Sequence, residues 1–248
     1  MLILLPPSET KRVGGEEGTR LDLAALGFPS LTAPRRTAVD AVRRLSRNLA
    51  AATAGLRLGG TQAAEAARNR VILTSPVMPA IDRYDGVLYE ALDAASLTPA
   101  QRAFAGRHVA IASAAFGLTG ALDPIPAYRL SHDSRLPGVA LGRLWRAPLS
   151  ELLAQTPGLL LDLRSEAYAN LGPLPARPDA VFVRVVSVDD QGRRRALNHF
   201  NKSGKGVFVR RLIQAGIVHD DVEGLLGWAR ASGIRLERGA PGELDLVV

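Results

Sequence analysis

The sequence predicts a single compact domain of the α+β class, in which helices surround a central mixed β-sheet. Uninterrupted apolar runs at Leu2–Leu5 and at residues 158–163 and 181–188 predict buried strands. Amphipathic helical patterns lie between these runs without a regular alternation of strand and helix. The 248 residues, 47% of them hydrophobic and 22% charged, suit one globular domain. We find no internal repeat and no low-complexity linker, so the expected domain covers residues 1–248.

The first half of the chain is expected to be mainly helical after its first strand. Apolar residues recur at three- and four-residue steps over residues 37–58, which predicts one amphipathic helix ended by a glycine pair that begins at Gly59. An alanine-rich helix over residues 62–70 and a short helix within residues 84–93 follow. The next helix is expected to open at Thr98, with a proline in its first turn.

The middle of the chain alternates between apolar and proline-rich segments. Residues 108–117 predict a buried strand that enters a turn, and residues 123–138 contain too many prolines for regular structure. Helical spacing returns over residues 141–156, although Pro148 is expected to break or restart that helix. The strand at residues 158–163 is followed by a short helix, for which Ser165 is the expected N-cap.

The C-terminal part is expected to begin with a β-hairpin. Residues 189–192 carry the turn signal between two strand-like segments. Residues 219–233 predict a capped helix that ends at a glycine. Residues 235–239 and 243–248 then predict a pair of short strands.

Composition and charge limit the classes of function. The formal net charge is +7, which favours a polyanionic partner but leaves RNA, DNA and anionic lipid open. The chain has no cysteine, which excludes disulfides, thiolate nucleophiles and cysteine-ligated metal centres. The N-terminus lacks the pattern of a signal peptide, and no apolar run approaches the ~18 residues of a membrane helix. We therefore expect a cytoplasmic protein with no membrane association.

One basic segment, residues 191–219, contains seven Lys or Arg and no Asp or Glu. Its pattern predicts a basic loop that leads into the start of a helix, where backbone N–H groups and lysines both favour phosphate. The alternative is a solvated charged face. The predicted phosphate-binding residues are the seven cations of this segment: Arg193, Arg194, Arg195, Lys202, Lys205, Arg210 and Arg211.

Two groups of polar residues that follow buried strands favour an enzyme instead. Carboxylates paired with lysines can transfer protons or hold a phosphorylated ligand if both groups open into one cleft. The candidate catalytic residues are Ser8, Glu9, Lys11, Glu166, Tyr168 and Lys202. The alternative is structural: Ser165 is a helix cap, Glu166 is a first-turn acid and Glu9 forms a loop ion pair. The four histidines lie far apart and the chain has no P-loop pattern, so we expect neither a metal nor a cofactor.

Several short motifs in a fixed order resemble the YaaA-type peroxide-stress protein family over about 200 residues. No motif is specific alone, and their joint order carries the resemblance. They are PPSETK (residues 6–11), YDGVLY (84–89), FGLTGALDPIPAYRL (116–130), LW (144–145), SEAY (165–168) and a basic helix pattern over residues 202–213.

This resemblance implies a fold of the family's own type with a positively charged cleft and a helix-hairpin-helix-like element. It also implies binding of duplex or branched DNA under oxidative stress. The helix-hairpin-helix element would lie at residues 56–72 or at residues 116–122. Because there is no cysteine to oxidise, protection against peroxide would act through a partner such as DNA.

Overall fold

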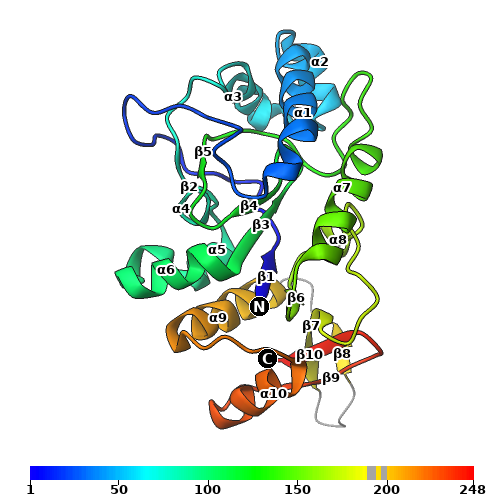
Figure 1. Ribbon diagram of the computed structural model, residues 1–248. Helices are drawn as coiled ribbons and strands as arrows, with labels where there is room; N and C mark the ends of the chain where they lie inside the picture. Colours follow the sequence, from blue (N-terminus) through cyan, green and yellow to red (C-terminus); the bar gives the residue numbers. More distant parts are fainter. Residues whose placement is uncertain (189–193, 197–199) are drawn as a thin grey trace.

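The computed structural model describes residues 1–188, 194–196 and 200–248, and its centre is a mixed β-sheet (Figure 1). The strand order is β4-β3-β1-β6-β7-β10-β9, and β8 pairs with the end of β7. A separate short ribbon pairs β2 with β5. The strands are β1 (Leu2–Leu5), β2 (Met78–Pro79), β3 (Val109–Ser113), β4 (Gly117–Gly120), β5 (Pro124–Ile125), β6 (Leu160–Asp162), β7 (Ala180–Val188), β8 (Arg194–Ala196), β9 (Leu236–Arg238) and β10 (Glu243–Val247).

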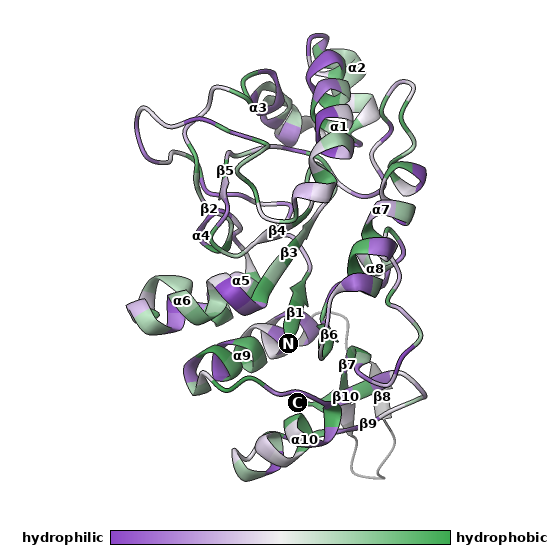
Figure 2. Ribbon diagram, viewed as in Figure 1, coloured by the Kyte–Doolittle hydropathy of each residue, from purple (hydrophilic) through white to green (hydrophobic). Residues whose placement is uncertain are grey.

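The five central strands β3, β1, β6, β7 and β10 run parallel, whereas β4, β8 and β9 are antiparallel to their neighbours. Strands covered on both faces need continuous apolar sequences, which is why the predicted apolar runs became strands. All of β1, β3 and β6 is buried, and β1 and β3 are coloured as hydrophobic in Figure 2. The predicted single α+β domain with a central mixed sheet is confirmed.

Helices cover the sheet on both sides. The contacts place α6 against β1 and β3, α9 against β7, and α5 against α9, whereas α7 packs against β4 and α1 (Figure 1). The α-helices are α1 (Thr32–Leu45), α2 (Leu49–Gly55), α3 (Ala66–Arg70), α4 (Ala80–Arg83), α5 (Val87–Leu92), α6 (Pro99–His108), α7 (Leu141–Gln155), α8 (Glu166–Ala169), α9 (Phe200–Ala215) and α10 (Val222–Ala231). The short 3₁₀ helices are η1 (Pro29–Leu31), η2 (Gly60–Glu65) and η3 (Ala94–Ser96).

Two helix predictions were wrong in their continuity. The single helix expected over residues 37–58 is split into α1 and α2, because the Asn48 side chain accepts a hydrogen bond from Ala51 N and starts a new helix there. Conversely, α7 continues through Pro148. Its buried residues Trp145 and Leu149 pack into the core on either side of the proline, and this tertiary packing outweighs the lost backbone hydrogen bond.

The basic segment was predicted as a loop before a helix, but α9 already begins at Phe200. Lys202 and Lys205 therefore lie in its first two turns. One glycine of this segment serves close packing: a Cβ atom on Gly206 would lie 2.2 Å from the carbonyl oxygen of Leu88 in α5. Only glycine allows the backbones of α5 and α9 to approach this closely.

Most other element predictions are confirmed with small shifts. Thr98 Oγ1 accepts a hydrogen bond from Gln101 N and so caps α6. The capped helix expected over residues 219–233 is α10, which begins at Val222 and is capped by Asp221. The Ser165 side chain makes no capping hydrogen bond to α8. β9 and β10 form the predicted pair, and β7 pairs antiparallel with β8, although the turn at residues 189–192 lies outside the described residues.

The structure does not show a helix-hairpin-helix element at either expected place. Residues 117–120 form β4, which corrects the prediction for residues 116–122. Residues 56–72 contain η2 and the short α3. Across the described part of the chain, no helix is long and apolar enough to cross a membrane.

Candidate functional site

The strand order places a crevice at the carboxyl ends of β1 and β6. These strands are parallel neighbours, but the chain leaves β1 to reach β3 on one side and leaves β6 to reach β7 on the other. Loops that diverge from adjacent parallel strands open a space between them, and ligands of α/β sheets bind there. A cavity of about 660 Å³ lies at this point, lined by residues that follow β1 and β6 and by residues of α5 and α9.

Four of the six predicted catalytic residues line this cavity. Ser8 and Glu9 follow β1, Tyr168 belongs to α8, and Lys202 belongs to α9. Lys205, predicted only as a phosphate contact, lines it as well. The structure therefore brings together polar groups from three regions that are far apart in the sequence.

Lys11 lies beneath the cavity wall and does not line it. Its buried ammonium group donates hydrogen bonds to the carbonyl oxygens of Ser8 at 2.9 Å and Glu9 at 3.2 Å, and it lies 4.2 Å from the ring centroid of Tyr128. Burial, followed by the nearby Arg129 guanidinium, lowers the pKa of Lys11 to about 7. Lys11 thus fixes the backbone of the loop that carries Ser8 and Glu9.

Arg129 fixes the Glu9 side chain and was not predicted from the sequence. Its guanidinium pairs with the Glu9 carboxylate and also contacts Glu65 at 3.3 Å. The Arg129 side chain is only 7% exposed, so these charges interact in a partly dry environment. An arginine about 120 residues from its partner gives no local sequence signal.

Glu166 points away from the other candidates. It is an exposed residue of α8 whose carboxylate contacts Arg184 at 3.2 Å. Arg184 in turn donates two hydrogen bonds to Glu243, at 2.6 and 2.8 Å. Glu166 therefore takes part in a surface ion-pair cluster and does not line the cavity.

Lys205 is buried at the carboxyl end of β6. Its ammonium group donates hydrogen bonds to the carbonyl oxygens of Leu163 and Arg164, at 2.9 and 3.3 Å. Burial lowers the pKa of Lys205 to about 8, although the nearby Asp162 carboxylate opposes this shift. This lysine is a cation of the cavity wall, whereas Lys202 is exposed.

The remaining predicted phosphate contacts differ in how free their side chains are. Arg210 is occupied by α5 and the segment after it: it donates to the carbonyl oxygens of Leu92 and Asp93 and to Ser96 Oγ. Arg211 is exposed and donates to Ser232 O at 3.1 Å. Arg193 lies outside the described residues, and the structure describes only the backbone of Arg194 and Arg195, in β8.

The cavity also contains groups that sequence reasoning missed. Asp85 lines it from the segment before α5, Asn201 from α9, and His132 from the proline-rich loop. The His132 ring meets the Tyr168 ring edge to face, with centroids 5.3 Å apart. Of these three residues, only Asp85 belongs to a motif noted in the sequence, YDGVLY.

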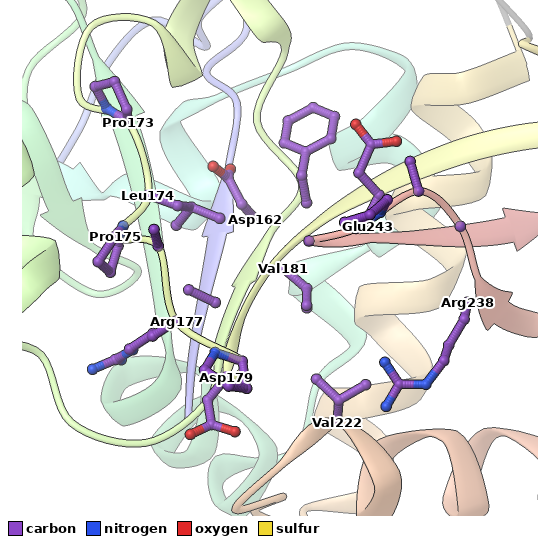
Figure 3. Close-up of a pocket in the computed structure, with 18 of the residues that line it drawn as sticks. Asp162, Pro173, Leu174, Pro175, Arg177, Asp179, Val181, Val222, Arg238 and Glu243 are labelled. Carbon is purple, nitrogen blue, oxygen red and sulfur yellow. The ribbon is translucent and has the colours of Figure 1, made fainter.

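A larger hollow of about 1,060 Å³ lies elsewhere, between the loop after α8, β7 and the turn joining β9 to β10 (Figure 3). Several charged groups around it already have partners: Asp162 pairs with Arg164, and Arg238 pairs with Glu223. Arg177 donates to two backbone carbonyl oxygens. A ligand there would have to displace these contacts, so we favour the smaller cavity as the functional site.

Comparison with known proteins shows which family the chain belongs to. The family model described as peroxide stress protein YaaA matches residues 1–237. The chain belongs to this YaaA family. A UPF0246 protein of Corynebacterium glutamicum strain R is 43% identical over 243 residues, covering 96% of this chain and 95% of its own. A UPF0246 protein of Streptomyces coelicolor is 38% identical over 251 residues, covering 97% and 94%. The YaaA resemblance predicted from the motifs is thus confirmed.

Proposed function

We propose that this YaaA-family protein acts in the peroxide stress response by binding the phosphate backbone of DNA at the mouth of the cavity between β1 and β6. The observation that carries the proposal is the position of Lys202, which is exposed, lies in the first turn of α9 and lines the cavity. The positive end of the helix and the lysine attract the same anion.

The contacts of the basic segment divide its cations into two groups. Lys202 and Arg211 are exposed on α9, and Lys205 adds charge to the cavity wall. Arg210 is occupied by carbonyl oxygens of the α5 region. We therefore assign phosphate binding at the cavity mainly to Lys202 and Lys205. Arg211 lies beside Ser232, outside the cavity lining, and would add a more distant backbone contact, with Arg193 to Arg195 preceding these residues in the chain.

Such contacts give affinity without base specificity. Phosphate groups are the same in every sequence, and lysine and arginine bind them mainly by charge. A protein without cysteine does not remove peroxide by thiol chemistry, so protection through DNA fits the composition.

Charge reversal tests the proposal. Lys202→Glu should weaken binding of unrelated duplex sequences by about tenfold or more in fluorescence anisotropy titrations at low salt, and Arg211→Glu should have a smaller effect. Arg20→Glu, an exposed arginine outside the segment, should change affinity little. Equal affinities for the Lys202 and Arg20 variants would contradict the proposal.

A second candidate function is catalysis on a small anionic or nucleotide-like ligand. The observation that favours it is the set of titratable groups, Glu9, His132 and Tyr168, that line the same cavity as the two lysines. Such groups can transfer protons to a bound ligand. Binding of a nucleoside monophosphate without measurable binding of duplex DNA would favour this function over the first.

A further inference from the structure

The cavity between β1 and β6 is much larger than the phosphate group that its lysines would bind. Its volume of about 660 Å³ equals the space of roughly twenty water molecules at about 30 Å³ each. Pockets of about 300–1,000 Å³ are typical of sites that enclose a whole small molecule. A phosphate at Lys202 would leave most of the cavity empty.

The chemistry of the lining differs between its elements. The lysines both come from α9, whereas hydrogen-bonding groups come from the loop after β1 and from Asp85. Aromatic surface comes from Tyr89 and Tyr168. A ligand that matches all three has an anionic group, a flat ring and polar ring edges, which is the composition of a nucleotide.

The walls of the cavity are held in place before any ligand binds. Lys11 fixes the carbonyl groups of Ser8 and Glu9, and Arg129 fixes the Glu9 carboxylate. The Tyr89 hydroxyl donates a hydrogen bond of 2.7 Å to Pro6 O. A preformed polar pocket lowers the ordering cost of binding a base that has left its stack.

We propose that this cavity receives one unstacked nucleotide of the bound DNA strand, with its phosphate at Lys202 and its base in the interior. The inference rests on the proposed DNA binding and names the part of the DNA that would occupy the cavity. Removing a base from an intact duplex breaks its pairing and stacking, and the cost is smallest where the base is already unpaired. The protein should consequently prefer DNA that contains an unpaired nucleotide.

The experiment compares an intact duplex with the same duplex carrying one unpaired 2-aminopurine. Wild-type protein should bind the second about tenfold more tightly, and 2-aminopurine fluorescence should rise as the base leaves its neighbours. Thr10→Trp places a large ring at the cavity without changing a lysine. This variant should lose both the preference and the fluorescence change while it keeps its affinity for the intact duplex.

Gln155→Trp is the matched control. Gln155 is exposed at the end of α7, before the amino end of β6, and so lies at the edge of the sheet opposite the cavity. This variant should behave as the wild type.

The outcomes separate the two proposals. Duplex binding that depends on Lys202, with no fluorescence change and no effect of Thr10→Trp, would overturn the nucleotide pocket and leave the phosphate-binding function intact. Absence of DNA binding at low salt would overturn both. Binding of free deoxyadenosine monophosphate that Thr10→Trp blocks, without strand binding, would assign the cavity to a small ligand and also overturn the inference.

Discussion

Lys205 Nζ donates a hydrogen bond of 2.9 Å to the carbonyl oxygen of Leu163. This contact joins the second turn of α9 to the end of β6 and places a buried cation in the cavity wall. Because burial lowers the pKa of Lys205 to about 8, the cavity loses a positive charge just above neutral pH.

DNA affinity should therefore fall as the pH rises from 7 to 9. Below about pH 8 Lys205 is charged and attracts phosphate, and above it the amine is neutral. Lys205→Met should bind more weakly at pH 7 and show a flatter pH profile in anisotropy titrations. Lys11→Met, which alters the lysine beneath the wall, should retain the fall near pH 8. A Lys205→Met profile that parallels the wild type would contradict this assignment.

Gly206→Ala should destabilise the protein. The new Cβ atom would lie 2.2 Å from Leu88 O and 2.8 Å from Ala91 Cβ, so α5 and α9 would have to separate. We expect a loss of about 1–3 kcal/mol or more in the free energy of unfolding, measured by urea denaturation.

Gly227→Ala is the matched control for this substitution. Gly227 is a helical glycine of α10, and a Cβ atom added to it would meet nothing within 4 Å. That variant should gain about 0.5–1 kcal/mol. Equal effects of the two substitutions would show that α5 and α9 are not in close contact.

The same close contact explains why sequence reasoning misplaced the start of α9. Gly204 and Gly206 lower helix propensity, and so the sequence around them favours a loop. The close contact of Gly206 depends on α5, which lies more than 100 residues away in the chain. The apolar runs behind β1, β6 and β7 could be predicted because burial on both faces leaves a local pattern. A close contact between two helices leaves only a glycine in the sequence, and a glycine can equally indicate a loop.

The candidate site, like the fold, could be predicted from the sequence only in part. Ser8 and Glu9 were found because they follow a buried strand, and the cavity indeed opens at the end of that strand. Glu166 follows the other strand, but its position at the start of α8 turns its carboxylate toward Arg184. Arg129 and Asp85 reach the site from distant loops, so only the three-dimensional fold brings them there.

Stability should rise between pH 7 and 10 in a way that depends on Lys11. Its pKa is about 7 in the folded protein and about 10.4 when unfolded, so the unfolded chain binds more protons in this range. The contribution to the free energy of unfolding increases with pH by up to about 1.4 kcal/mol per pH unit. In Lys11→Met, the free energy of unfolding measured by urea denaturation should rise less steeply with pH between pH 7 and 9.5. The same rise with pH in Lys11→Met and in the wild type would mean that Lys11 titrates normally in the folded state.

Purified protein should not consume hydrogen peroxide with a thiol reductant. The chain has no cysteine to cycle between oxidation states. We expect the rate of peroxide loss with dithiothreitol to equal that of the buffer alone. Turnover well above that background would show that the stress role is direct and does not pass through DNA.

The salt dependence of DNA binding tests the central claim most directly. If Lys202 neutralises one phosphate, the slope of the logarithm of affinity against the logarithm of salt concentration should be shallower by about one in Lys202→Ala than in the wild type. Arg20→Ala should keep the wild-type slope. We predict this difference for a duplex titrated between roughly 50 and 200 mM salt. Identical slopes for Lys202→Ala and the wild type would contradict the claim that the mouth of the cavity binds the DNA backbone.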